Sequence, residues 1–137
     1  MLKIFFASHG NLAKGMESTI KVIYGAIPNL TTFAAYVDDY DLAKEIDKFY
    51  SDKVADNDDV LLCSDIYGGS VNQVMYRYLD KPNTRLVTGV NLAFFLEIAN
   101  VQTLNDQNLK QIIDNSKEFL CEVKKEDEVK KEDEDFF

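Results

Sequence analysis

The feature that most constrains the fold of this chain is a regular alternation of short apolar runs with longer segments of helical periodicity. Four runs predict buried strands: residues 2–7, 31–37, 60–64 and 84–88. Apolar residues recur at helical spacing in 11–26, 42–54, 70–79, 92–99 and from about 105 onward. Such alternation predicts parallel strands joined by right-handed crossovers. We therefore expect an α/β fold, a single three-layer domain with a mainly parallel four-stranded sheet and helices on both faces.

Capping residues set the expected starts of three helices. Asp41 is expected as the N-cap of the second helix, and Ser70 as the cap of the third. The stretch from Thr103 to Asp106 resembles a capping box in front of the last helix. These positions predict where the three helices begin.

Charge and the scarcity of histidine exclude several classes of function. The chain has 137 residues, 46% of them hydrophobic, with 24 acidic against 15 basic side chains and a net charge of −9. A chain this acidic lacks the positive surface that nucleic acids require. One histidine and two cysteines without paired spacing do not form a metal site. We expect no nucleic acid, no metal and no cofactor.

The composition changes near the C-terminus. Residues 124–137 hold seven acidic and four basic side chains, and their apolar residues are Val129, Phe136 and Phe137. We expect one domain over 1–123 and a charged, flexible tail over 124–137. Docking of a partner by the two terminal phenylalanines is an alternative role for that tail.

Two further features predict a cytoplasmic protein. The apolar stretch 2–7 is too short for a signal peptide or a membrane span. Cys63 lies in an apolar run and Cys121 near the end of the last periodic segment, so we expect two buried free thiols, as in a reducing compartment.

Polar residues and glycines follow three of the predicted strands. The candidate site residues are Ser8, His9 and Gly10 after the first strand, Asp65, Gly68, Gly69 and Ser70 after the third, and Gly89 and Asn91 after the fourth. In parallel sheets, ligands bind outside the carboxyl ends of the strands. We therefore expect these loops to meet at one edge of the sheet.

The expected chemistry of this edge is phosphorylation of an imidazole. A carboxylate bonded to one ring nitrogen of His9 fixes the tautomer and leaves the other nitrogen as a nucleophile. Backbone N–H groups of a glycine turn at a helix start form an anion pocket. Each part also has a structural reading. Asp65 can cap a turn, the glycines can relieve backbone strain, Ser70 can cap a helix and Asn91 can open the short helix that follows.

Three motifs in order resemble the IIA component of the mannose class of the bacterial phosphotransferase system. They are Ser8-His9-Gly10 after a strand, Asp65-Ile66-Tyr67-Gly68-Gly69-Ser70-Val71-Asn72, and Gly89-Val90-Asn91-Leu92. Their order and spacing match that family over about residues 1–123. The family has prolines at the positions of Val71 and Ala93, so the chain departs from it at two helix starts.

The resemblance implies a cytoplasmic phosphocarrier without a cofactor. His9 would accept a phosphoryl group from phospho-HPr and pass it to a histidine of the IIB component during sugar uptake. Asp65 would be the carboxylate beside it, and Ser70 with the amides of Gly68 and Gly69 would contact the phosphoryl group. The membrane would be involved only indirectly, through IIC and IID. The resemblance also implies a homodimer that exchanges a C-terminal antiparallel strand, for which Phe119, Cys121 and Val123 alternate suitably, although a helix through Cys121 fits the same residues.

Other functions remain open from the residues alone. A phosphocarrier that feeds dihydroxyacetone kinase has the same fold and histidine, but a different second motif. Ser70, His9 and Asp65 could also form the triad of a hydrolase, although the chain has no GxSxG elbow. A two-component receiver needs an acidic pair where Ser8 and His9 stand, and a flavodoxin needs a hydroxyl-rich loop after its first strand, which residues 11–15 do not supply.

Overall fold

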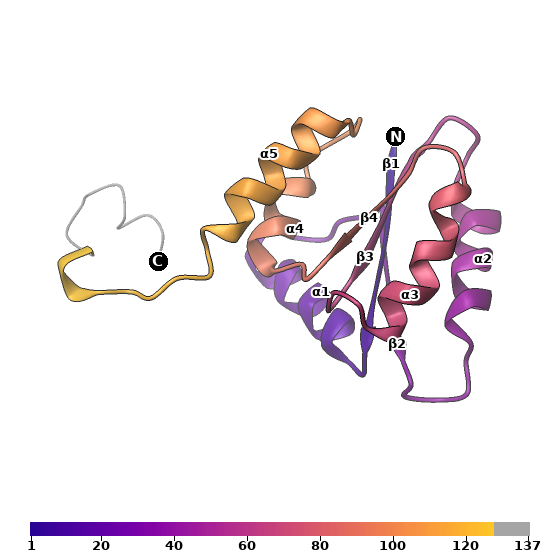
Figure 1. The fold of residues 1–137 in the computed structure, drawn as a ribbon, viewed down its shortest axis with the longest axis horizontal. Coiled ribbons are helices and arrows are strands. Elements are labelled where there is room, and N and C mark those ends of the chain that lie inside the picture. Colours follow the sequence, from indigo (N-terminus) through magenta and orange to yellow (C-terminus); the bar gives the residue numbers. More distant parts are fainter. Residues whose placement is uncertain (128–137) are drawn as a thin grey trace.

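The computed structural model describes residues 1–127, in which a parallel sheet of four strands lies between two layers of helices (Figure 1). The elements in chain order are β1 (Leu2–His9), α1 (Leu12–Ile23), β2 (Leu30–Ala35), α2 (Leu42–Lys53), β3 (Asp59–Ser64), α3 (Ser70–Tyr76), the 3₁₀ helix η1 (Arg77–Asp80), β4 (Thr84–Thr88), α4 (Leu92–Ile98), α5 (Asp106–Lys117) and the 3₁₀ helix η2 (Lys125–Asp127). The strand order is β2-β1-β3-β4 and every pair is parallel. The predicted three-layer α/β fold is confirmed.

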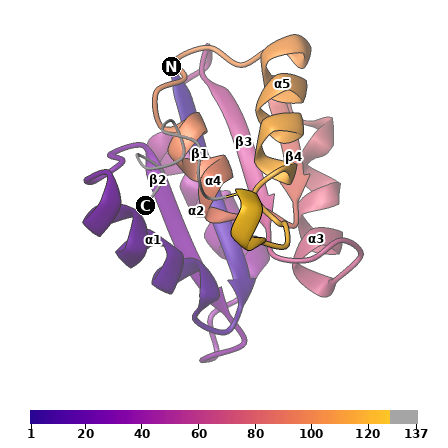
Figure 2. The same cartoon turned by 90° about the vertical axis from the view of Figure 1, so that its left-hand side faces the viewer.

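Both faces of the sheet are covered, which explains the unbroken apolar runs of its central strands. Helices α1, α4 and α5 pack on one face, and α2 and α3 on the other (Figures 1 and 2). Successive side chains of β1 alternate between the two cores: Ile4 and Phe6 face the first set of helices, and Phe5 and Ala7 the second. Each side chain removed from water in this way contributes about 1.5–3 kcal/mol to folding before entropy is counted.

The strand order brings the ends of β1 and β3 together. These two strands are neighbours in the sheet, and Ala7 pairs with Ser64. The residues that follow, His9 and Asp65, therefore lie side by side at the carboxyl edge. On its other side β1 pairs with β2, so that His9 lies opposite Ala35. The topology thus places the loops after β1, β2 and β3 around one point.

Two predicted helix caps are wrong, for the same physical reason. The N-cap of α3 is Gly69, with extended backbone, and Ser70 is already the first helical residue. At α5 the cap is Asn105, whose side chain accepts from the Asn108 N–H while the Asn108 side chain accepts from the Asn105 N–H. The observed cap lies one position before Ser70 in α3 and two positions after Thr103 in α5, and in both cases it has the extended conformation that a cap requires.

The predicted ends of two other segments also differ. The strand expected over 31–37 ends at Ala35, because Tyr36 has a left-handed backbone (φ +68°) that cannot continue a strand. The helix expected over 70–79 becomes the 3₁₀ helix η1 from Arg77, and Leu79 is exposed rather than packed inward.

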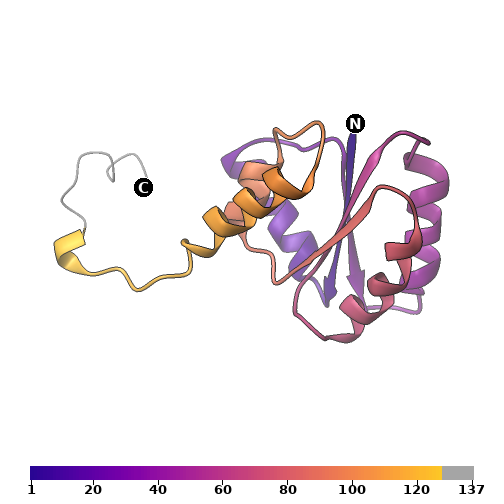
Figure 3. The same cartoon turned by 45° about the horizontal axis from the view of Figure 1, so that its top comes forward.

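The C-terminal segment departs furthest from expectation. Helix α5 ends at Lys117, so no helix passes through Cys121, which is exposed, whereas Cys63 is buried as predicted. Within 118–127 the one regular element is η2, and no fifth strand forms in the single chain. Figure 3 shows this segment leading away from the body of the molecule. The rest of the predicted tail, with Phe136 and Phe137, lies outside the described residues.

Candidate functional site

His9 and Asp65 form a close pair at the carboxyl edge of the sheet. Asp65 Oδ2 accepts hydrogen bonds from both the main-chain N–H and the ring Nδ1 of His9, each at 2.8 Å. Asp65 Oδ1 accepts from the main-chain N–H of Ile66 at 3.1 Å. The Asp65 side chain is 10% exposed and the His9 side chain 44%. The carboxylate is therefore held by three N–H groups, while the imidazole that it orients faces solvent.

The surroundings of Asp65 keep its side chain ionised. Burial raises the pKa of this carboxyl, but the hydrogen bonds from the His9 main chain and ring outweigh burial, so the net pKa is lower than usual. An ionised carboxylate only accepts hydrogen bonds. Nδ1 of His9 must therefore carry the proton, and Nε2 is left with a lone pair.

Ser70 lies on the other side of the imidazole ring. Its hydroxyl oxygen is 3.1 Å from His9 Nε2. Because Nε2 has no proton in this tautomer, the Ser70 hydroxyl donates to it. The ring is thus fixed at both nitrogens, between a carboxylate from the end of β3 and a hydroxyl from the first turn of α3.

The glycine turn before α3 determines how closely the main chain approaches the ring. Gly68 has a left-handed backbone (φ +76°), which favours glycine over other residues. A Cβ on Gly69 would lie 3.2 Å from His9 Cε1 and 2.8 Å from Ile66 Cγ2. The N–H of Gly69 donates to the carbonyl of Ile66 at 3.3 Å, so the turn already uses that amide.

Substitution of Gly69 by alanine should therefore disturb the His9 ring directly. We expect the fold to persist with about 1 kcal/mol lower stability, since Ile66 is exposed and can move. We also expect a changed rate of modification of the single imidazole by diethyl pyrocarbonate. Gly15→Ala in α1 is the matched control, because its Cβ meets no atom within 4 Å. A Gly69→Ala protein with wild-type stability and imidazole reactivity would contradict this reading of the turn.

Four of the predicted site residues have structural contacts instead. Ser8 is buried; its hydroxyl oxygen accepts from the Ala13 N–H at 2.7 Å and its proton goes to the Gly10 carbonyl, so it supports the start of α1. Gly10 has a left-handed backbone and donates to the Ala35 carbonyl. Each of these contacts connects the loop after β1 to its neighbours.

The two predicted site residues in the loop after β4 also make structural hydrogen bonds. Gly89, also left-handed (φ +69°), donates its N–H to the Ser64 carbonyl. The Asn91 side chain accepts from the Phe94 N–H at 2.9 Å, capping α4, and donates to the Ser116 carbonyl of α5. The structural reading of Asn91 is the one observed. Within residues 1–127, these hydrogen bonds join Gly89 and Asn91 to Ser64, Phe94 and Ser116 and not to His9.

Tyr36 is a site residue that the sequence reasoning missed. Its hydroxyl donates to Ser70 Oγ at 2.7 Å, and its ring centroid lies 5.3 Å from that of His9. It follows β2, whose end lies next to His9. The predicted strand 31–37 has Tyr36 in its interior, and nothing in that pattern indicates that the strand ends one residue before Tyr36.

The two helix starts without the family prolines are intact. Val71 is fully buried and packs with Met75 in the core beneath α2 and α3. Ala93 lies in the first turn of α4, which Asn91 caps. Neither substitution alters a group that contacts His9.

Three other kinds of feature would bear on function in the described residues: a reactive thiol, a metal site and a membrane-spanning helix. Cys63 is fully buried, and burial raises the pKa of its thiol, so it is not a nucleophile. Among residues 1–127, no three histidine, cysteine or acidic side chains cluster as metal ligands. No helix in the same range has the length and apolar character needed to cross a membrane.

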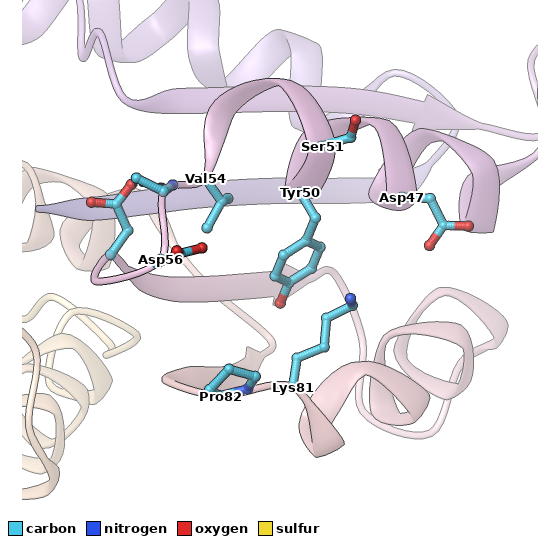
Figure 4. A pocket seen from close by; sticks show the side chains of 9 residues that line it. Asp47, Tyr50, Ser51, Val54, Asp56, Lys81 and Pro82 are labelled. Atoms are coloured by element: carbon cyan, nitrogen blue, oxygen red, sulfur yellow. Dashed lines mark hydrogen bonds between the residues drawn. The ribbon is translucent and has the colours of Figure 1, made fainter.

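A separate cavity of about 440 Å³ lies between the end of α2 and the loop before β4. Figure 4 shows Tyr50 and Lys81 facing each other across it, and the Lys81 ammonium is 4.7 Å from the centre of the Tyr50 ring. Its residues precede β3 and β4, so the cavity lies at the amino edge of the sheet, opposite His9. It is therefore not part of the His9 site.

A family model matches most of the chain. Residues 3–117 match the model of the PTS system fructose IIA component. This range contains Tyr36, Asp65 and Ser70, which lie around His9. No curated protein sequence matches the chain.

Several solved structures with a similar fold are described as phosphotransferase system proteins of bacteria. A protein from Klebsiella pneumoniae, whose suggested role is a phosphoenolpyruvate-dependent sugar phosphotransferase system permease, is 27% identical, with a TM-score of 0.78 over 88% of this chain and 90% of that one. The IIA protein associated with the fucose utilization operon of Streptococcus pneumoniae is 26% identical, with a TM-score of 0.73 over 91% and 95%. A mannose/sorbose specific IIA subunit from Enterococcus faecalis (21% identity, TM-score 0.73, 89% and 94% covered) shares the fold.

Proposed function

The chain belongs to the phosphotransferase system fructose IIA family, and from that premise we propose that it carries a phosphoryl group on His9. The donor is the phosphohistidine of HPr and the acceptor is a histidine of a IIB component. The observation that carries the proposal is the pair of His9 and Asp65, with Nδ1 bonded to the carboxylate and the imidazole side chain 44% exposed. An imidazole held in one tautomer, whose Nε2 lone pair is released when the Ser70 hydroxyl turns away, is the nucleophile that this transfer requires.

Phosphoryl transfer at this site needs no proton to leave the His9 ring before attack; the Ser70 hydroxyl turns away from Nε2 and frees its lone pair. The Nε2 lone pair of His9 forms the new bond to phosphorus, and the bond from phosphorus to the HPr imidazole breaks, with its electron pair returning to that ring. Because Nδ1 keeps its proton, the phosphorylated His9 ring carries positive charge. The ionised Asp65, 2.8 Å from Nδ1, stabilises that charge.

The remaining groups are suited to holding a phosphoryl group only briefly. Ser70 can turn its hydroxyl from Nε2 to a phosphoryl oxygen. Gly68 belongs to the turn that leads to Ser70, and its amide is a further candidate donor. The Gly69 amide can join them if its long bond to Ile66 opens. Within residues 1–127, no ion pair brings a lysine or arginine to His9, Asp65 or Ser70. Without a fixed cation, onward transfer to IIB is not slowed by tight binding.

We propose that the protein is cytoplasmic and homodimeric, in contact with the membrane only through IIC and IID. Strand β4 is at the edge of the sheet and partly exposed along its length, beside a groove of about 250 Å³. Leu120 and Val123, which follow α5, are 90% and 69% exposed. Segment 119–123 of each subunit could pair with the other subunit's β4 and cover these side chains. Light scattering should then give twice the mass of the chain; the monomer mass at micromolar concentration would contradict the dimer.

The geometry also fits a hydrolase, because Ser70, His9 and Asp65 have the spacing of a serine triad. A fluorophosphonate probe tests this alternative, since it labels only an activated serine. We expect no label on Ser70. A phosphocarrier that feeds dihydroxyacetone kinase is the other alternative. Transfer of the phosphoryl group to a IIB component would support the sugar-uptake role over this alternative.

The direct test of the proposal is labelling by phospho-HPr. We expect one phosphate for each chain, labile in acid and stable in base, as phosphohistidine is, and discharged by addition of a IIB component. Acid-stable label, or none, would overturn the proposal.

A further inference from the structure

We propose that Tyr36 is a positioning residue of the phosphoryl site, acting through Ser70. The geometry that carries this inference is a continuous chain of hydrogen bonds, Tyr36 hydroxyl to Ser70 hydroxyl to His9 Nε2, with lengths of 2.7 and 3.1 Å. It rests on the proposed function in one respect, that Nε2 is the atom phosphorylated. It assigns a role to a residue outside the three sequence motifs.

The direction of these hydrogen bonds follows from counting protons. A hydroxyl has one proton to donate and two lone pairs that accept. Tyr36 donates to Ser70 Oγ, so the Ser70 proton must go elsewhere, and the acceptor within reach is the Nε2 lone pair. On the other side of the ring the Nδ1 proton goes to Asp65. Tyr36 and Asp65 thus fix the polarity of the network from its two ends.

The position of Tyr36 is enforced by the backbone. Its φ of +68° is unusual for a residue with a large side chain and costs free energy, of the order of a hydrogen bond, that the surroundings must offset. That conformation turns the chain sharply at the end of β2, beside His9. The side chain is 61% exposed, so core packing does not hold it there. Its hydroxyl contacts Ser70, and its ring lies against the ring of His9.

The same network can serve the phosphorylated protein. When Nε2 bonds to phosphorus, it no longer accepts a proton, and the Ser70 hydroxyl must find another acceptor. Because Tyr36 still donates to Ser70 Oγ, the Ser70 proton is directed to a phosphoryl oxygen rather than back to Tyr36. No covalent bond changes in this step; only the Ser70 hydroxyl rotates. Tyr36 therefore keeps Ser70 as a donor to the site in both states.

Tyr36→Phe tests the inference, because it removes the hydroxyl and keeps the ring. The chain has a single histidine, so ¹⁵N spectra of the imidazole report His9 alone. We expect the Nε2 resonance to move toward the position of a nitrogen without a hydrogen bond, with the Nδ1–H tautomer unchanged. After phosphorylation by phosphoramidate, we expect phosphohistidine to hydrolyse about 5-fold faster, the effect of losing roughly one neutral hydrogen bond. Tyr40→Phe, exposed in the same loop, is the matched control.

A double-mutant cycle separates positioning from a general disturbance. In a Ser70→Ala protein, Tyr36→Phe should have no further effect on the Nε2 resonance or on hydrolysis, since its route to the ring is gone. Equal effects of Tyr36→Phe with and without Ser70, or a Tyr36→Phe protein with the wild-type Nε2 resonance, would overturn the inference. Neither measurement uses HPr or IIB. Failure of HPr to label the protein would therefore contradict the proposed donor, whereas the Nε2 resonance and the hydrolysis rate would still decide the role of Tyr36.

Discussion

His9→Ala should abolish the acceptance of phosphate from phospho-HPr, with labelling reduced at least about 10³-fold, to background. The reason is that the nucleophile itself is removed, and no second imidazole exists in the chain to replace it. The fold should survive, because the His9 side chain is 44% exposed and the main-chain N–H that bonds Asp65 is retained. Labelling with radioactive phosphoenolpyruvate, enzyme I and HPr measures the loss, and thermal unfolding checks the fold.

The matched control is Cys121→Ser. Cys121 is an exposed thiol, a second kind of nucleophilic side chain that can carry a labile phosphate, and it is outside the His9 site. This variant should be labelled as fully as the wild type. Label that persists in His9→Ala and disappears in Cys121→Ser would place the phosphate on sulfur and end the claim for His9.

The topology of the sheet was accessible from the sequence because it depends on patterns that any buried parallel strand must show. The runs at residues 2–7 and 60–64 are apolar throughout, since helices cover both faces of β1 and β3. Given two such neighbouring strands, the residues that follow them must meet at the carboxyl edge. That is why the contact of His9 with Asp65 could be predicted, and it is present at 2.8 Å.

The details that were wrong depend on single backbone angles. Composition does not distinguish a tyrosine that continues β2 from one that ends it with φ +68°, and Tyr36 was therefore missed. Ser70 was expected as a cap, but the left-handed turn at Gly68 lets Gly69 take the extended position, and the hydroxyl is left free to reach His9. Because the cap lies one residue earlier than predicted, Ser70 is a neighbour of the imidazole and not a structural cap.

The exposure of Cys121 has a different origin. Its segment places Phe119, Cys121 and Val123 at alternate positions, which predicts burial of one face, yet Phe119 is 51% and Val123 69% exposed, and Cys121 is exposed too. An alternating apolar pattern indicates that one face of a segment is buried. That burial can be within the chain or against a second subunit. The disagreement between pattern and exposure in 119–123 is what supports the proposed exchange between subunits.

Asp65→Asn should slow phosphoryl transfer by about 10³-fold while leaving the protein folded. Three N–H groups converge on the Asp65 carboxylate, two from His9 and one from Ile66. An asparagine offers one oxygen, so its NH₂ group must face one of these donors. If it faces His9, it donates to Nδ1 and favours the tautomer in which Nε2 carries the proton and has no lone pair. If it faces Ile66, the ring keeps its tautomer but loses the charge that stabilises its phosphorylated form.

Stability gives an independent measure of the same carboxylate. Hydrogen bonds from His9 hold the pKa of Asp65 below its usual value, against the effect of burial. A depressed native pKa contributes stability above the unfolded pKa of about 3.9, which is lost as pH falls through the native value. The wild type should therefore have a higher Tm than Asp65→Asn at pH 7, and the difference should shrink below about pH 4. Wild-type transfer by Asp65→Asn, with a pH-independent difference in Tm, would show that Asp65 neither orients His9 nor stabilises its charge.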